Sequence, residues 1–242
     1  MAVAYGLPAD EALKAVTLDD TLAEAYAALG FATIMHDFDW VMAERHLRRA
    51  VELNPNYVTG RLWYSYFLGM AGRFEEALTQ VRRALEVAPL TPVAHQALSW
   101  TYYHARRYEE SVATSRTLIT NEPEYGLGFV FFSVSLSHTK RFDEAITAGL
   151  RGVELLGRTP YSLSWLASAY AAADKRDEVH AILEEIQQMS AKRYVSPYLL
   201  AMIYCKLGDD ARALLELERA LAIRDARLVW LGVDAQFDRV RD

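Results

Sequence analysis

Cysteine is almost absent from this chain of 242 residues, which contains only Cys205. A single cysteine excludes an intrachain disulfide framework and fits a reducing compartment such as the cytosol. Long apolar runs are also lacking: no stretch approaches the roughly 20 residues that a membrane-spanning helix needs. Residues 1–7 are too short and too uncharged for a secretory signal. We therefore expect a cytoplasmic protein without a membrane partner.

An excess of positive charge is missing as well. The chain has 26 Lys and Arg against 32 Asp and Glu, a net charge of −6. General affinity for nucleic acid requires a basic face that releases counterions, so we expect no nucleic-acid partner. The sequence also lacks a Gly-rich phosphate loop, a nucleophile elbow and a spaced cluster of Cys and His. These absences favour a protein that is not an enzyme and that uses neither a cofactor nor a metal.

What the sequence does contain is a pattern that repeats every 34 residues. Its clearest copy, residues 72–89, places Ala77, Val81 and Ala84 on one stripe of an amphipathic helix that stops at Pro89. Steps of 34 from Ala77 reach mostly small residues, namely Ala43, Ser111, Ala145, Val179 and Ala213. A second series with the same period consists of Ser65, Ser99, Ser133, Ala167 and Ala201. Several interleaved series with one period indicate a repeat protein.

The pattern resembles the tetratricopeptide repeat (TPR) family, whose helix-turn-helix unit has this period. The unit from Val58 to Leu90 carries the matching small, aromatic and proline positions: Ser65, Leu68, Gly72, Phe74, Ala77, Ala84 and Pro89. The resemblance covers about residues 23–225 and implies an all-α, right-handed superhelix that forms a single domain over 1–242. Its expected parts are six units (23–57, 58–91, 92–125, 126–159, 160–193 and 194–225), an N-terminal half unit (8–18) and a C-terminal cap (226–242).

Three departures from the family pattern are visible. The first unit has one extra residue between Gly30 and Ala43, and Pro197 enters the first helix of the sixth unit. Gly149 and Gly152 are expected to weaken the second helix of the fourth unit by about 1 kcal/mol each relative to alanine. The chain starts at a half unit, which suggests a piece of a longer protein. Its ending resembles the TPR regions of large bacterial signalling and transcription regulators.

The resemblance also implies a concave surface lined by the first helix of each unit. Residues one step from the packing seam, together with two tryptophans beside them, are the expected partner-binding set: Phe31, Leu62, Trp63, Tyr66, Gln96, Trp100, Tyr103, His104, Val134, His138, Tyr161, Trp165, Tyr198 and Met202. This set is aromatic and nearly uncharged, which is typical of recognition surfaces and predicts a groove for a peptide segment. The alternative is that many of these rings pack between adjacent helices as ordinary core.

The kind of partner is only partly restricted by the sequence. One TPR subfamily binds acidic chaperone tails through cationic side chains, but the matching positions here are Leu62, Trp63, Tyr66, Val93 and Ala97, which disfavours that ligand. His104 and His138 occupy equivalent positions and are expected to face each other, yet two imidazoles alone make a poor zinc site. We therefore predict a scaffold for a protein or peptide partner. A homodimerisation module and a sensor for a small apolar ligand remain the alternatives.

Overall fold

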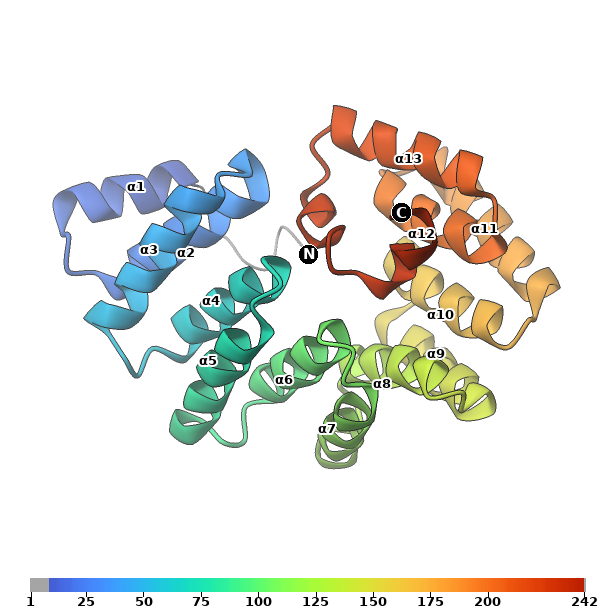
Figure 1. Cartoon of the computed structure of the whole chain (residues 1–242), viewed down its shortest axis with the longest axis horizontal. Coiled ribbons are helices and arrows are strands. Elements are labelled where there is room, and N and C mark those ends of the chain that lie inside the picture. Colours follow the sequence, from blue (N-terminus) through green and yellow to red (C-terminus); the bar gives the residue numbers. More distant parts are fainter. Residues whose placement is uncertain (1–8, 242) are drawn as a thin grey trace. The chain divides into compact units, whose positions relative to one another are not determined.

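The computed structural model describes residues 9–241, and every regular element in that range is helical (Figure 1). The first helices of the pairs are α2 (Ala23–Ala32), α4 (Val58–Met70), α6 (Pro92–His104), α8 (Gly126–His138), α10 (Pro160–Ala172) and α12 (Pro197–Leu207). Their second helices are α3 (Trp40–Leu53), α5 (Phe74–Val87), α7 (Tyr108–Asn121), α9 (Phe142–Leu156), α11 (Arg176–Ser190) and α13 (Asp210–Ala222). One further helix, α1 (Ala9–Leu18), packs on α2. The expected all-α class is confirmed.

The helices form two compact units, which divide between Thr101 and Tyr102 near the end of α6. Unit 1 contains α1 to α5 and most of α6. Unit 2 contains the last turn of α6 and everything after it. Consecutive helices contact each other from α1 to α5 in unit 1 and from α7 to α13 in unit 2. The predicted half unit at 8–18 corresponds to α1, although Pro8 lies outside the described residues.

Small side chains at the repeated positions explain how the helices approach one another. Ala43, Ala77, Ser111, Ala145, Val179 and Ala213, the series on the second helices, are all completely buried. The matching series on the first helices is buried as well, and Ser133 Oγ donates a hydrogen bond of 2.7 Å to the carbonyl of Ala145 on α9. A small residue on each face lets two helix backbones come close, so the period found in the sequence is the period of the packing.

The turn inside each helix pair repeats with the same period in its backbone geometry. A left-handed residue with positive φ follows each first helix, at Phe38, Gly72, Arg106, Lys140, Asp174 and Gly208. Steps of 34 connect all six. Glycine adopts this conformation without steric strain, whereas a residue with a Cβ pays about 1–2 kcal/mol. Four of the six turns therefore carry local strain.

The strain predicts that replacement of an exposed turn residue by glycine stabilises the protein. For Lys140→Gly (φ 61°) we expect a gain of about 0.5–1 kcal/mol in the free energy of unfolding, because released strain outweighs the added entropy of the unfolded chain. Gly208→Ala (φ 78°) is the matched control and should lose about 1 kcal/mol. Urea unfolding of both variants measures the difference. A loss of stability in Lys140→Gly would contradict this account.

The extra residue in the first unit is absorbed by a change of helix type. After α2 the chain continues as a π-helical turn, Thr33–Asp37, and then reaches the left-handed Phe38. A π turn closes its hydrogen bonds over one more residue than an α turn, so it accommodates a single insertion without breaking the helix. As a result Ala43 still reaches its buried position. The α-helix α2 ends at Ala32 for this reason.

The expectation that Gly149 and Gly152 only weaken their helix needs correction. Both lie within the uninterrupted α9 and are buried. A Cβ added to Gly149 would lie 3.0 Å from Leu166 Cδ1 and 3.0 Å from Ser133 Oγ. A Cβ on Gly152 would meet Val130 Cγ2 at 3.2 Å. The two glycines thus allow α8 and α10 to approach α9 closely, a tertiary gain that helix propensity does not include.

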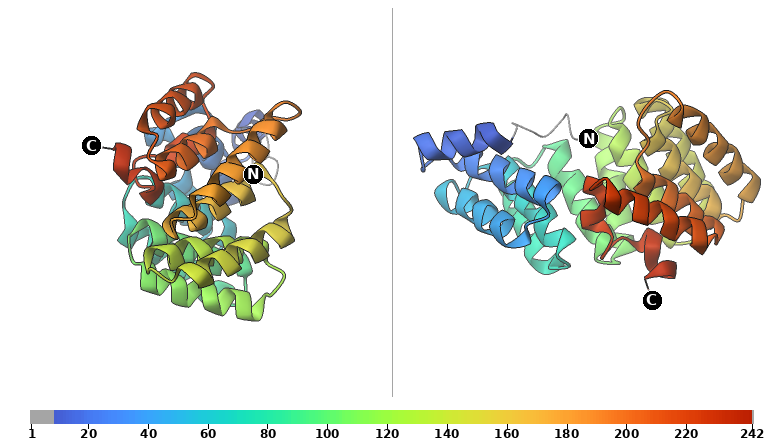
Figure 2. Two further views of the ribbon diagram at one scale, coloured as in Figure 1. Left: turned by 90° about the vertical axis from the view of Figure 1, so that its right-hand side faces the viewer. Right: turned by 90° about the horizontal axis from the view of Figure 1, so that it is seen from above.

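The C-terminal segment, which we define as residues 225–241, forms two short 3₁₀ helices, η3 (Ala226–Trp230) and η4 (Ala235–Val240). Helix η4 packs on α12, the first helix of the last pair (Figure 2). On α13, apolar side chains remain exposed, among them Leu214, Leu215 and Leu221. The segment therefore contacts the first helix of the last pair and leaves these side chains of α13 uncovered.

Candidate functional site

In unit 1, side chains of the predicted site come from three successive first helices. Phe31, Tyr66 and Trp100 hold equivalent positions on α2, α4 and α6. Phe31 and Trp100 are partly exposed, whereas Tyr66 is 9% exposed. The rings of Phe31 and Trp63 stack with their centroids 5.1 Å apart. We call Phe31, Trp63, Tyr66 and Trp100 the unit 1 aromatic face. Rings offer a large contact area at a low entropic cost, which suits this face for binding.

Two predicted residues of unit 1, Gln96 and Leu62, are buried and do not form part of the exposed face. Gln96 is buried and donates a hydrogen bond of 3.3 Å from Nε2 to the Tyr66 hydroxyl. Leu62 is buried on α4. Neither presents its side chain to a partner, so the ordinary-core alternative describes these two residues. The partly exposed rings of Phe31, Trp63 and Trp100 are the ones that a partner can reach.

In unit 2 the predicted site residues are in contact with the C-terminal segment. Tyr103 is completely buried, and its hydroxyl accepts a hydrogen bond of 2.7 Å from Gln236 Nε2. The Gln236 side-chain carbonyl accepts one of 2.7 Å from Ser168 Oγ on α10. The Tyr198 hydroxyl on α12 donates a bond of 2.8 Å to Asp234 Oδ2. Side chains from three helices thus converge on two residues of one segment.

His104 and His138 do not face each other, contrary to the sequence expectation. His104 is 1% exposed and stacks nearly parallel on Trp230 with ring centroids 4.6 Å apart. His138 stacks on Tyr108 at 4.3 Å. Tyr103 contacts both imidazoles edge-on, at 5.1 and 5.5 Å, and so lies between them. Among residues 10–241 no group of three or more His, Cys, Asp or Glu side chains is placed to hold a metal ion.

Burial sets the protonation of these groups. Loss of water around the ring lowers the pKa of His104 to about 3, although the interaction with the Val233 backbone opposes the shift. Desolvation lowers the pKa of His138 to about 4, and the positive charges of Lys206 and Arg106 act in the same direction. Burial also raises the pKa of Asp234. Both imidazoles are therefore neutral near pH 7 and serve as aromatic surfaces.

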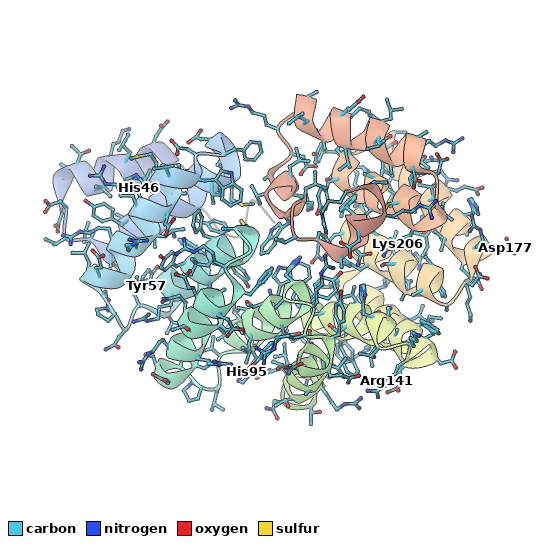
Figure 3. The ribbon with its side chains drawn as sticks, viewed as in Figure 1. His46, Tyr57, His95, Arg141, Asp177 and Lys206 are labelled. Carbon is cyan, nitrogen blue, oxygen red and sulfur yellow. The ribbon has the colours of Figure 1, made fainter. Side chains whose placement is uncertain are left out.

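The position of His104 and His138 recurs twice more, as Ala172 and Lys206 at further steps of 34. Lys206 lies on α12 (labelled in Figure 3), and burial lowers the pKa of its ammonium group, while the charges of Asp234 and Asp238 oppose that shift. At these equivalent positions, the His104 imidazole on α6 stacks on Trp230 of the C-terminal segment, and the Lys206 amine on α12 is influenced by the charges of Asp234 and Asp238.

The remaining predicted residues lie inside the unit 2 core. Val134 and Met202 are buried on α8 and α12. Trp165 is buried on α10, where the partly exposed Tyr161 meets it edge-on with centroids 6.2 Å apart. None of Val134, Met202 and Trp165 presents its side chain to solvent. In unit 2, therefore, first-helix residues that were expected to line an open groove are largely enclosed.

Sequence reasoning did not include the segment residues that complete this arrangement, namely Trp230, Asp234, Gln236 and Phe237. One signal was available. Asp225 and Asp234 each start a 3₁₀ turn, and each accepts a hydrogen bond of 3.0 Å from the backbone N–H two residues later. An aspartate that bonds two residues ahead is a local turn signal that can be recognised in a sequence. Which helices the turns would contact is not encoded locally.

Two further features bear on the kind of function. A hollow in unit 1 is lined by α1, α2 and α3, with both apolar and charged walls that include Leu13, Val41, Glu44 and Arg49. This mixed lining is unlike a closed pocket for a small apolar ligand. Within residues 9–241, no helix combines the length and apolar character required to cross a bilayer.

Comparison with solved structures identifies the fold. No protein-family model matches the sequence, and no curated protein does. The chain is similar to TTC0263, a TPR protein of Thermus thermophilus, with a TM-score of 0.64, 17% identity, and coverage of 80% of this chain and 99% of the other. It is also similar to a chain of the APC/C hetero-tetramer Cut9–Hcn1 (TM-score 0.65, 14% identity, coverage of 92% and 44%).

A third similar structure is YrrB, described as a TPR protein with an unusual peptide-binding site (TM-score 0.50, 13% identity, coverage of 87% and 100%). At these identities the comparisons establish the fold alone. The helix pairs with a period of 34 therefore have the TPR fold, as the sequence predicted.

Proposed function

We propose that this chain is a non-catalytic scaffold that binds a peptide segment or a partner protein on the unit 1 aromatic face. The observation that carries the proposal is the position of Phe31, Tyr66 and Trp100 on three successive first helices, with Trp63 stacked on Phe31. Partly exposed aromatics, supported by a buried hydrogen bond from Gln96, form an apolar surface that is held in place. Two TPR structures similar to this chain come from a hetero-tetramer and from a protein with a peptide-binding site, which supports this function.

The proposal is tested with peptides selected from a displayed random library on the full chain. We expect Trp100→Ala to weaken the binding of the selected peptides by about 30-fold, because a central aromatic anchor contributes about 2 kcal/mol or more. Trp63→Ala should act in the same direction. Fluorescence anisotropy with a labelled peptide provides the dissociation constants.

The matched control is Arg83→Ala on α5, where the exposed guanidinium pairs with the exposed carboxylate of Glu86 at 2.8 Å. It should change the dissociation constant less than twofold. Equal losses in Trp100→Ala and Arg83→Ala would refute the assignment of the binding face. Tyr66→Phe tests whether the Gln96 contact matters, since it removes the hydroxyl and keeps the ring.

Self-association is the second candidate, and the exposed leucines of α13 favour it. Leu214 and Leu221 are seven residues apart and lie on one face of the helix, and both are about half exposed or more. A homodimer through this face would show a mass that depends on concentration, and Leu214→Glu would abolish that dependence. The cytoplasmic location and the role in a bacterial signalling or transcription regulator, both expected from the sequence, stay predictions.

A further inference from the structure

The C-terminal segment contacts the helices of unit 2 as a bound peptide would. It does not continue the helical repeat, because it consists of two short 3₁₀ turns separated by residues 231–234. Its partners lie on α6, α10 and α12, as far as 133 residues away in the sequence. The exposed leucines of α13 show that the segment leaves part of the last helix pair uncovered. Its contacts are made with the same first-helix side that forms the aromatic face in unit 1.

The polar side-chain atoms of Gln236 and Asp234 in the segment each have a hydrogen-bond partner. Gln236 uses both ends of its amide, toward Tyr103 and Ser168. Asp234 uses one oxygen for its own turn and the other for the Tyr198 hydroxyl. A buried site of this kind discriminates strongly, because a ligand without these groups would leave buried hydroxyls unpaired. The contacts therefore select an aspartate followed two residues later by glutamine.

Two aromatic anchors of the segment complete the arrangement. Trp230 stacks on His104, and Phe237 meets Tyr198 edge-on with ring centroids 4.9 Å apart. At the rim, Arg106 pairs with Asp238 at 2.7 Å, where both side chains are partly exposed. Phe237 is buried and Trp230 is partly exposed. Aromatic anchors with a charged rim are the arrangement found in protein interfaces.

We propose that this face of unit 2 is a recognition site for a partner segment with the pattern Asp-x-Gln-aromatic, and that residues 225–241 occupy it as a built-in competitor. The inference rests on the proposed scaffold function and adds the ligand chemistry of a second surface. A partner that carries this pattern displaces the C-terminal segment and takes over its contacts with Tyr103, Ser168 and Tyr198. The chain's own Asp234-Ala235-Gln236-Phe237 is the example of the pattern.

Tethering decides how the competition must be measured. A short connection to α13 gives the chain's own segment an effective concentration on the order of millimolar. An identical peptide added in solution therefore binds the wild-type chain only near millimolar concentration, whatever its intrinsic affinity. Substitutions within residues 225–241 that weaken their binding, and that leave the contacting residues of the helices unchanged, make the site available to the added peptide.

The experiment uses the full-length chain with Asp234→Ala and Gln236→Ala together, and a fluorescent peptide with the wild-type sequence of residues 225–241. We expect the peptide to bind this variant at least 10-fold more tightly than it binds the wild-type chain, and to raise the melting temperature of the variant. A peptide carrying the same two substitutions should neither bind nor stabilise. Full-length Arg239→Ala, which removes only an exposed pair with Asp210, is the matched control and should behave as wild type.

Three results would overturn the proposal. The first is a variant that keeps its circular dichroism spectrum but does not bind the peptide, which would make the segment ordinary core. The second is binding that does not depend on Asp234 and Gln236 of the peptide. The third is a wild-type dimer that Gln236→Ala abolishes, which would assign the site to the segment of a second copy. The milder variant Gln236→Leu carries the same expectation if the double variant unfolds.

These outcomes are separable from the test of the unit 1 aromatic face. Library peptides that depend on Trp100 should bind equally well to the wild type and to the Asp234→Ala/Gln236→Ala variant. If no peptide binds in a Trp100-dependent way but the segment peptide still binds, the proposal for the unit 1 aromatic face is rejected and the unit 2 site is kept. If library peptides bind through Trp100 but the segment peptide does not bind, only the inference for unit 2 is rejected.

Discussion

Acidification from pH 7 to pH 5 is expected to destabilise the protein by about 2 kcal/mol through His104 alone. Burial lowers the pKa of His104 to about 3, against about 6.5 in an unfolded chain. Between these values the unfolded chain binds a proton that the folded chain does not, so stability is complete above pH 6.5 and falls as the pH drops. His138, with a pKa of about 4, adds a loss of similar sign and size.

Neighbouring groups modify this profile without reversing it for His104. Tyr103, Trp230 and the Val233 backbone contact the imidazole, and the charge of Arg106 acts on it. Asp234 acts in the opposite direction: burial raises its pKa, so the folded state takes up a proton before the unfolded chain does, which favours folding as the pH falls.

Urea unfolding at pH 7 and pH 5 isolates the contribution of His104. In His104→Phe the ring remains available to stack on Trp230, but it no longer titrates. We expect the pH-dependent loss in this variant to be about 2 kcal/mol smaller than in the wild type. His180→Gln, at an exposed position of α11, is the control and should keep the wild-type loss. An unchanged loss in His104→Phe would show that His104 is accessible to protons in the folded state.

The fold could be predicted from the sequence because its determinants are local and repeated. A small residue at Ala77 or Ala145 is required wherever two helices meet, and the same requirement recurs every 34 residues. The left-handed turns follow the same rule, although only Gly72 and Gly208 announce them by residue type. The extra residue before Ala43 was visible in the sequence, but the π turn that accommodates it was not, because that turn depends on backbone hydrogen bonds.

The site was predictable only to the level of the helix face. Periodicity places Tyr66, Trp100 and Tyr103 on the first helices, but it cannot show that Trp100 is partly exposed and Tyr103 fully buried. Among the contacts of Tyr103 is Gln236, which lies more than a hundred residues further along and has no local signature. A repeat pattern describes contacts between neighbouring units, whereas the C-terminal segment crosses several of them.

The docking of the C-terminal segment leads to the second large effect, expected for Phe237→Ala. The Phe237 ring is 1% exposed and packs against Tyr198, so its removal should cost about 3–5 kcal/mol of docking energy. The loss seen in global unfolding is limited to the energy that docking itself contributes, because beyond that point the segment simply detaches. A direct probe of detachment is therefore more informative than the melting temperature.

Trypsin provides that probe, since Arg239 and Arg241 lie within the segment. When opening and closing are fast, the cleavage rate follows the population of the detached state. A docking loss of about 3 kcal/mol should therefore accelerate cleavage after Arg239 on the order of 100-fold.

The control for this experiment is Val240→Ala, at a partly exposed position of the same segment, which should change the rate less than 10-fold. Cleavage in unit 1 should keep its wild-type rate in both variants, because the hydrogen bonds described for Asp234 and Gln236 come from residues of unit 2. Equal acceleration by Phe237→Ala and Val240→Ala would mean that the Phe237 ring does not anchor the segment. Its docking energy would then have to reside in the polar contacts of Asp234 and Gln236.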